Sequence, residues 1–202
     1  MDVKKYLSEW SECYRKDFVE NIMPFWMKNG LDRKHGGVYT CLDRDGTLMD
    51  TTKSVWFQGR FGFIAAYAYN NIEKNPEWLA ASKSCIDFIE AHCFDTDGHM
   101  FFEVMEDGTP LRKRRYVFSE GFAAIAMSEY SIASGDKTYA QKALDLFNRI
   151  MYMLDTPGFL TPKYLDTMKS QGHSITMILV NTAARIRAAI DAPVLTEQID
   201  RS

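Results

Sequence analysis

The chain has 202 residues, of which 46% are hydrophobic and 25% charged, and its formal net charge is -3. These values predict one sizeable hydrophobic core and exclude a disordered chain, and the balanced charge argues against nucleic-acid binding. The dense basic run at residues 112–115 is explained by a solvated turn before a helix.

The first ten residues lack the apolar region of a signal peptide, and no stretch reaches membrane-spanning length. We therefore expect a cytoplasmic protein without a membrane partner. The four cysteines show no CxxC spacing and no clustered histidines beside them, so we expect neither a metal site nor a disulfide framework.

Apolar residues at helical intervals predict a first amphipathic helix over residues 2–28. Residues 32–50 alternate aromatic and polar side chains around Asp45-Gly46, which predicts a β-hairpin. A second helix should start near residues 52–54, where Ser or Thr can cap it, and end near Ile72. This helix is apolar on nearly all sides, so we expect it to be buried.

The same order of elements then recurs along the rest of the chain. A half-buried helix opens at Asn75-Pro76, and an aromatic strand at residues 100–102 leads into an Asp107-Gly108 turn. The further helices are expected at about 116–133 (apolar), 137–154 (amphipathic) and 172–190 (apolar).

The spacing of particular residues indicates an internal repeat. Gly37, Gly98 and Gly158 are separated by 61 and 60 residues, and Arg60 and Glu120 by 60. This period fits one outer helix, one loop and one inner helix per unit. We interpret the chain as a single partial domain, residues 1–202, built of three αα-hairpin units with approximate bounds 1–74, 75–135 and 136–202.

Helices that are apolar on both sides must lie between an outer layer and each other. The sequence therefore predicts an all-α protein that forms about half of an α/α toroid, with short β-hairpins in its loops. The two ends of such an arc would expose apolar surface, which favours self-association, for example as a homodimer. We expect no cap on the arc, because the polar tail after Ile190 is short and Pro193 should break a helix.

The loops before the inner helices converge on one mouth, which collects several polar and aromatic residues. Three long polar side chains, Lys53, Gln58 and Arg60, accompany Trp56 within eight residues, which is unusual for a core-facing helix. Sugar sites use such mixtures, because aromatic rings stack on the sugar and polar groups bind its hydroxyls. Trp56 or Phe57 taken alone is better explained as an ordinary core aromatic.

Two further groups on the second unit are candidates. Glu120 lies on an otherwise apolar helix, so its carboxylate must be paired or face a cavity. We expect Arg60, at the equivalent place one unit earlier, to be its partner. Tyr116, at the start of the same helix, is expected to offer a hydroxyl to a ligand.

The four histidines receive different interpretations. His35 precedes paired glycines and is expected to be a structural turn residue, whereas His92 and His99 are expected on the surface. His173 starts an inner helix and is a candidate substrate contact.

Four segments carry a family resemblance: DRKHGGVYTCLDRDG (32–46), KSVWFQGR (53–60), RYVFSEGFAAIAMSEY (115–130) and, more weakly, SITMILVNTAARI (174–186). The spacing of the glycines, the Asp-Gly turn and W-x-Q-x-R makes the first two segments specific. The segments resemble the N-acylglucosamine 2-epimerase family, which includes cellobiose and mannose epimerases, related ketose–aldose isomerases and the renin-binding protein. The resemblance covers the whole chain but only the N-terminal half of the family's domain.

The resemblance implies an (α/α)6 barrel whose reaction inverts C2 of a reducing sugar through an enediolate, with two acid/base groups on opposite faces. In the family, an arginine matching Arg60 binds substrate, where a cation stabilises the developing oxyanion. The two catalytic histidines fall in the other half, so this chain is expected to hold no catalytic residue and to be inactive alone. The expected substrate-binding residues are Lys53, Trp56, Gln58, Arg60, Tyr116, Glu120 and His173.

We expect a small-molecule sugar as ligand and no cofactor, although some relatives require a nucleotide activator. Met177 occupies a position near His173 in a way that resembles the acylglucosamine branch more than the cellobiose branch.

Two other functions stay open at this point. A glycoside hydrolase or lyase of another α/α-toroid family needs two carboxylates across the cleft, for which Asp43, Asp45 and Glu120 are available. A non-catalytic partner-binding module would use the exposed edges of the half-ring.

Overall fold

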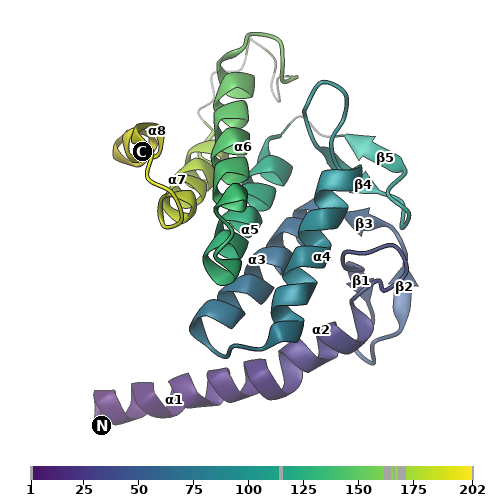
Figure 1. Ribbon diagram of the computed structural model, residues 1–202, viewed down its shortest axis with the longest axis vertical. Coiled ribbons are helices and arrows are strands. Elements are labelled where there is room, and N and C mark those ends of the chain that lie inside the picture. Colours follow the sequence, from purple (N-terminus) through teal and green to yellow (C-terminus); the bar gives the residue numbers. More distant parts are fainter. Residues whose placement is uncertain (1, 114–115, 162–164, 166, 168–171, 202) are drawn as a thin grey trace.

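The structure is a computed structural model that describes residues 2–113, 116–161, 165, 167 and 172–201. Its helices alternate between two layers, and Figure 1 shows α4 and α6 in front of α3 and α5. Each inner helix packs against the next inner helix and against the outer helix that follows it. The inner helices are α3 (Val55–Asn71), α5 (Phe118–Ser134) and α7 (Ser174–Arg187), and the outer helices are α4 (Pro76–His92), α6 (Lys137–Asp155) and α8 (Pro193–Asp200).

The predicted alternation of buried and half-buried helices is confirmed. Most of α5 is buried, which agrees with its nearly uniform apolar sequence. In α6 the buried residues recur every three or four positions, from Tyr139 to Met153, as expected for an amphipathic outer helix. Asn75 and Asp136 cap α4 and α6, since each side chain accepts a backbone N–H of the first turn.

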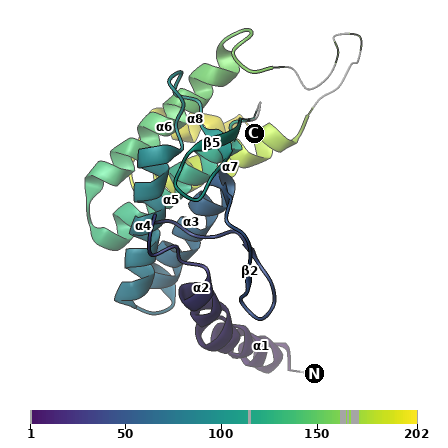
Figure 2. The same cartoon turned by 90° about the vertical axis from the view of Figure 1, so that its right-hand side faces the viewer.

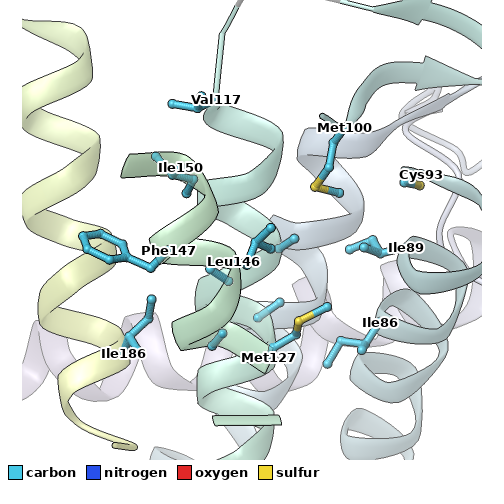
Figure 3. Packing of buried hydrophobic residues seen from close by; sticks show 14 of the residues in the cluster. Ile86, Ile89, Cys93, Met100, Val117, Met127, Leu146, Phe147, Ile150 and Ile186 are labelled. Atoms are coloured by element: carbon cyan, nitrogen blue, oxygen red, sulfur yellow. The ribbon is translucent and has the colours of Figure 1, made fainter. Parts of the chain in front are cut away.

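The core lies between the outer helices α4 and α6 and the inner helices α5 and α7. Figure 3 shows Ile86 and Ile89 facing Met100 and Met127, with Phe147, Ile150 and Ile186 extending the same cluster. Because each layer of helices adds its apolar stripe to one continuous cluster, the units are stabilised by their neighbours.

The N-terminal helix spans residues 3–29, close to the predicted range of 2–28, and it contains one irregular turn. α1 (Val3–Asp17), the π-helix η1 (Phe18–Ile22) and α2 (Met23–Asn29) follow without a break. Met23 N–H bonds to the Phe18 carbonyl five residues earlier, directly before Pro24, which has no N–H of its own. None of the residues of α1 is buried, and Figure 2 shows this helix leading away from the helical layers.

Two expectations about helix ends are wrong. Ser54 occupies the position before α3 but its side chain makes no capping hydrogen bond. Pro193 does not break a helix but opens α8, because proline is tolerated in the first turn, where its missing N–H has no partner to lose. Leu195 of α8 is fully buried against the core, so this helix covers the outer side of α7.

The loops before α3 and α5 contain the predicted β-hairpins, with Gly46 and Gly108 at positive φ in their Asp-Gly turns. The strands are β1 (Cys41–Leu42) with β2 (Leu48–Asp50), and β4 (Phe101–Val104) with β5 (Pro110–Lys113). A short strand that the sequence did not predict, β3 (Lys53–Ser54), pairs with β4 and joins the loops of the two units.

Strand pairing fixes the period of the first two units at 62 residues, not at 60 or 61. Adding 62 to both members of each β1–β2 pair gives two of the three β4–β5 pairs, and the turn glycines Gly46 and Gly108 match in the same way. The matching pairs are Cys41 with Asp50 and Glu103 with Arg112, then Leu42 with Leu48 and Val104 with Pro110. Gln58 of the first unit therefore corresponds to Glu120, and Arg60 corresponds to Phe122.

No helix in the described part of the chain combines the length and apolarity that crossing a membrane requires.

The inner helices approach closely at Gly59, and we predict that Gly59→Ala destabilises the protein. A Cβ there would lie 2.6 Å from the carbonyl carbon of Phe122 on α5, although alanine favours the helix itself by about 1 kcal/mol. The overpacking should lower the free energy of unfolding by roughly 1–3 kcal/mol. Urea unfolding followed by circular dichroism measures this change.

The control is Gly172→Ala, because a Cβ at Gly172 meets no atom within 4 Å. A Gly59→Ala protein at least as stable as the parent would contradict the close approach of α3 and α5.

Candidate functional site

The three inner helices line one hollow on their shared face. Its volume is about 390 Å³. Trp56 and Arg60 come from α3, Phe118 and Phe122 from α5, and Met177, Ile178 and Asn181 from α7. The hollow therefore combines residues that lie up to 125 positions apart in the sequence, and of the predicted site residues it includes Trp56 and Arg60.

Trp56 is the centre of an aromatic cluster in this hollow. Its ring is half-buried and meets the edges or faces of Phe102, Phe118 and Phe122 at centroid distances of 5.1, 5.2 and 5.9 Å. Such edge-to-face contacts fix the orientation of the ring while part of it stays accessible.

Arg60 lies one helical turn after Trp56 and is exposed. Its guanidinium carbon lies 4.2 Å from the centroid of the Phe122 ring and 5.7 Å from that of Phe57. Within the described residues, no carboxylate lies within ion-pair distance of this guanidinium. Its planar set of five N–H donors is thus held over aromatic rings and available to a ligand.

Lys53 does not line the hollow, contrary to the expectation for a substrate-binding residue. Its side chain is fully buried, and Nζ donates to Asp32 Oδ2 at 2.6 Å and to the carbonyls of Gly36 and Glu106, both at 2.8 Å. All three protons of the ammonium group are used, so none is left for a sugar. Lys53 instead ties the first loop to the hairpin of the second unit.

The ion pair with Lys53 sets the charge state of Asp32. Burial alone would raise the pKa of Asp32, but the hydrogen bond from Lys53 and those from the backbone N–H groups of His35 and Lys34 outweigh it. The pKa of Asp32 is therefore held below its ordinary value of 3.8.

Gln58 is also fully buried, which corrects its assignment to the site. Its Oε1 accepts the Val38 N–H at 2.8 Å and its Nε2 donates to the Val38 carbonyl at 2.6 Å. This two-point contact holds the loop against α3. The sequence contained a signal for it, because Gln58 lies about 200° around the helix from both Trp56 and Arg60.

Glu120 is not the partner of Arg60. It is fully buried, its Oε1 accepts the Met100 N–H at 2.6 Å, and the same oxygen lies 2.5 Å from His99 Nδ1. The expected pairing followed from equating Arg60 with Glu120, whereas the 62-residue period places Glu120 at the position of Gln58. His99 is consequently a buried residue and not a surface one.

The remaining predicted residues lie near the hollow without lining it. Tyr116 is half-buried, with its ring 5.8 Å from that of Phe118. His173 is exposed directly before α7, one turn before Met177. Their contacts with a substrate stay predictions.

Of the two remaining histidines, His35 agrees with its predicted environment and His92 agrees only in part. His35 lies in the glycine turn, where its N–H bonds to Asp32, which agrees with a turn residue. His92 is half-buried, with its ring 5.0 Å from that of Phe88, so the expected surface position is only partly correct.

The alternation of inner and outer helices around a shared hollow defines a partial α/α toroid. A sequence profile of the N-acylglucosamine 2-epimerase family matches residues 37–176. Because this match covers more than half of the chain, the chain belongs to the N-acylglucosamine 2-epimerase family, and the resemblance inferred from the sequence is confirmed.

Particular relatives agree with this assignment. N-acylglucosamine 2-epimerase of Rattus norvegicus is 28% identical over 189 residues, a match that covers 91% of this chain and 45% of the rat protein. Cellobiose 2-epimerase of Eubacterium cellulosolvens is 29% identical over 161 residues, covering 74% of this chain and 37% of that protein. The chain thus spans less than half of the length of these relatives.

A solved structure supports the fold. Cellobiose 2-epimerase from Spirochaeta thermophila superposes with a TM-score of 0.84 at 20% sequence identity, over 99% of this chain and 54% of that one.

We predict that Lys53→Met destabilises the protein by roughly 3–5 kcal/mol at pH 7, because it leaves the buried Asp32 carboxylate without its cation. In the parent protein, the low pKa of Asp32 contributes stability above pH 3.8, and this is lost as the pH falls through the folded pKa. In the variant, burial without the cation raises the pKa of Asp32. The difference between the two proteins should therefore shrink as the pH falls to about 4, where Asp32 of the variant takes up a proton.

Urea titrations at pH 7 and pH 4 measure this difference. Lys34→Met, which removes an exposed lysine two residues from Asp32, serves as the control. Equal stability of Lys53→Met and the parent at pH 7 would show that the ion pair is dispensable.

Proposed function

We propose that the chain forms the substrate-binding wall of a sugar 2-epimerase or a related aldose–ketose isomerase. The substrate would be an N-acyl-D-glucosamine, interconverted with N-acyl-D-mannosamine, or a related hexose. The observation that carries the proposal is the Arg60 guanidinium, which has no carboxylate partner among the described residues and lies in an aromatic hollow beside Trp56. Family membership supplies the reaction class.

The chemistry of C2 inversion explains why this arrangement is suitable. Removal of the C2 proton places negative charge on the oxygens at C1 and C2 of an enediolate. A guanidinium fixed beside those oxygens stabilises this charge with two parallel hydrogen bonds. The exposed part of Trp56 offers an apolar surface to the C–H face of the sugar.

The proton transfers themselves need other groups. Among the described residues, the seven that line the hollow include no histidine and no carboxylate. We therefore propose that the two acid/base residues belong to the part of the family's domain that lies outside these 202 residues, and that the chain alone binds sugar without turning it over.

A glycoside hydrolase is a weaker alternative. Its mechanism requires two carboxylates facing the scissile bond. Glu120 is buried against His99 and Met100, and Asp43 and Asp45 are exposed residues of the first hairpin turn that bond to nearby backbone N–H groups. None of the three lines the hollow.

A partner-binding module remains a second candidate because α1 exposes an apolar stripe. Val3, Leu7 and Tyr14 are 59%, 61% and 66% exposed. Such a stripe supports association with another chain, including a second copy.

All four cysteines are free thiols, which supports a cytoplasmic location for either function.

We predict that the 202-residue chain binds N-acetylglucosamine or cellobiose with a change in tryptophan fluorescence. Arg60→Ala should weaken this binding at least about tenfold, since removing a charged hydrogen-bond donor costs roughly 1.5–3 kcal/mol. Arg187→Ala, which removes an exposed arginine from the far end of α7, should leave the affinity unchanged. No response to any sugar would favour the partner-binding module.

We predict that a complete protein containing this chain exchanges the C2 hydrogen of its sugar with deuterated water, whereas the 202-residue chain does not. Arg60→Ala in the complete protein should lower the exchange rate by roughly 10²-fold or more with an intact fold, as for other removed oxyanion donors. Mass spectrometry of the recovered sugar measures the exchange. Release of a new reducing end without exchange would instead establish a hydrolase.

A further inference from the structure

We propose that Glu120 is a positioning residue that holds Trp56 in the orientation the sugar wall needs. Glu120 acts through the start of strand β4 and does not touch the hollow itself. This inference rests on the proposed function for the meaning of the wall, but the geometry that it describes is independent of any substrate.

Side chains of the first turn of α5 contact the three successive residues before Phe102, which are His99, Met100 and Phe101. Glu120 Oε1 accepts the Met100 N–H at 2.6 Å and contacts His99 Nδ1 at 2.5 Å. Ser119 Oγ donates to the Phe101 carbonyl at 3.0 Å. Both anchoring side chains are buried, at 0% and 3% exposure, so water does not compete for these contacts.

The anchored strand carries the ring that supports Trp56. Phe102 follows immediately and meets Trp56 in an edge-to-face contact with centroids 5.1 Å apart. On the next residue, Glu103 pairs with Ser54, which lies two positions before Trp56. Trp56 is therefore fixed between β4 on one side and Phe118 of α5 on the other.

The first unit contains the equivalent side-chain contact to the loop, made by an amide instead of a carboxylate. Gln58, the counterpart of Glu120, binds both the N–H and the carbonyl of Val38, the counterpart of Met100. In Glu120, the second oxygen Oε2 is buried and has no hydrogen-bond partner among the described residues. In Glu120→Gln, an amide nitrogen would replace Oε2 and supply a donor, as Gln58 Nε2 does for the Val38 carbonyl. Glu120→Gln is therefore the conservative replacement.

A purely structural role and a positioning role differ in what they do to Trp56. Glu129 provides the matched control, because it is a second buried carboxylate on α5, at 7% exposure. Its Oε1 accepts a hydrogen bond from Asn70 at 2.7 Å. Glu129→Ala removes a comparable contact without touching β4 or Trp56.

The test uses the 202-residue chain labelled with fluorotryptophan, in which Trp56→Phe identifies the fluorine signal of Trp56 among four. Glu120→Ala and Ser119→Ala should move the Trp56 signal and weaken N-acetylglucosamine or cellobiose binding by roughly tenfold, which is about 1.4 kcal/mol. Glu120→Gln should keep the parent position and affinity. Glu129→Ala should lower the melting temperature and leave the Trp56 signal in place.

The positioning role is overturned if Glu120→Ala leaves the Trp56 signal and the sugar affinity unchanged, or if Glu129→Ala moves the signal equally. Where Glu120→Ala does not fold, Ser119→Ala decides, because it removes one hydroxyl from the same anchor. If the Trp56 signal of the parent protein does not change when either sugar is added, the proposed function is overturned instead. Displaced Trp56 signals in the variants would still establish that Glu120 and Ser119 position Trp56.

Discussion

A polar side chain on an inner helix must find its partners inside the protein or face the hollow, and this constraint organises the structure. An unpaired polar group in the core loses several kcal/mol of hydration. Gln58 and Glu120 satisfy the constraint by binding backbone groups of the loops. Arg60 satisfies it by facing the hollow. The same need for partners therefore holds the loops against the inner helices and explains why Arg60 lies in the hollow.

Contacts between the loops also explain how two consecutive units form one wall. Lys53 reaches from β3 to the Glu106 carbonyl in the second hairpin, and β3 pairs with β4 at the same place. The tight contact between Gly59 and Phe122 brings the helices together one turn deeper. Trp56 and Phe122 can meet only because both connections fix the offset between the units.

The sequence was sufficient to predict the order and type of the helices up to α7 and of the two hairpins, because local signals determine them. The Asp-Gly turns require positive φ, and the helical stripes are visible in the spacing of apolar residues. The pairing of β3 with β4 was not predictable in this way, since it joins two-residue segments about fifty positions apart whose partners are set by packing. Ser54 has the extended backbone of an N-cap residue, but its side chain accepts no N–H of the first turn, and this side-chain orientation is not visible in the sequence.

The candidate site was predicted in part, and the errors came from the repeat register. A period of 60 placed Glu120 opposite Arg60, whereas 62 places Phe122 there and makes Phe118 the counterpart of Trp56. Helical geometry separates Trp56 and Arg60, which share a face, from Gln58, which lies about 200° away. Asn181 was not predicted, because the sequence of the third unit contains no Asp-Gly turn from which its helical positions could be matched to those of the other units.

The composition of the hollow assigns a definite share of the proposed reaction to this chain. A guanidinium keeps its proton at any physiological pH, so Arg60 can stabilise an enediolate but cannot take or return the C2 proton. Inversion at C2 requires one proton-transfer group on each face of the planar intermediate. The described residues that line the hollow include no histidine and no carboxylate, so in the proposed reaction both proton transfers fall to other residues.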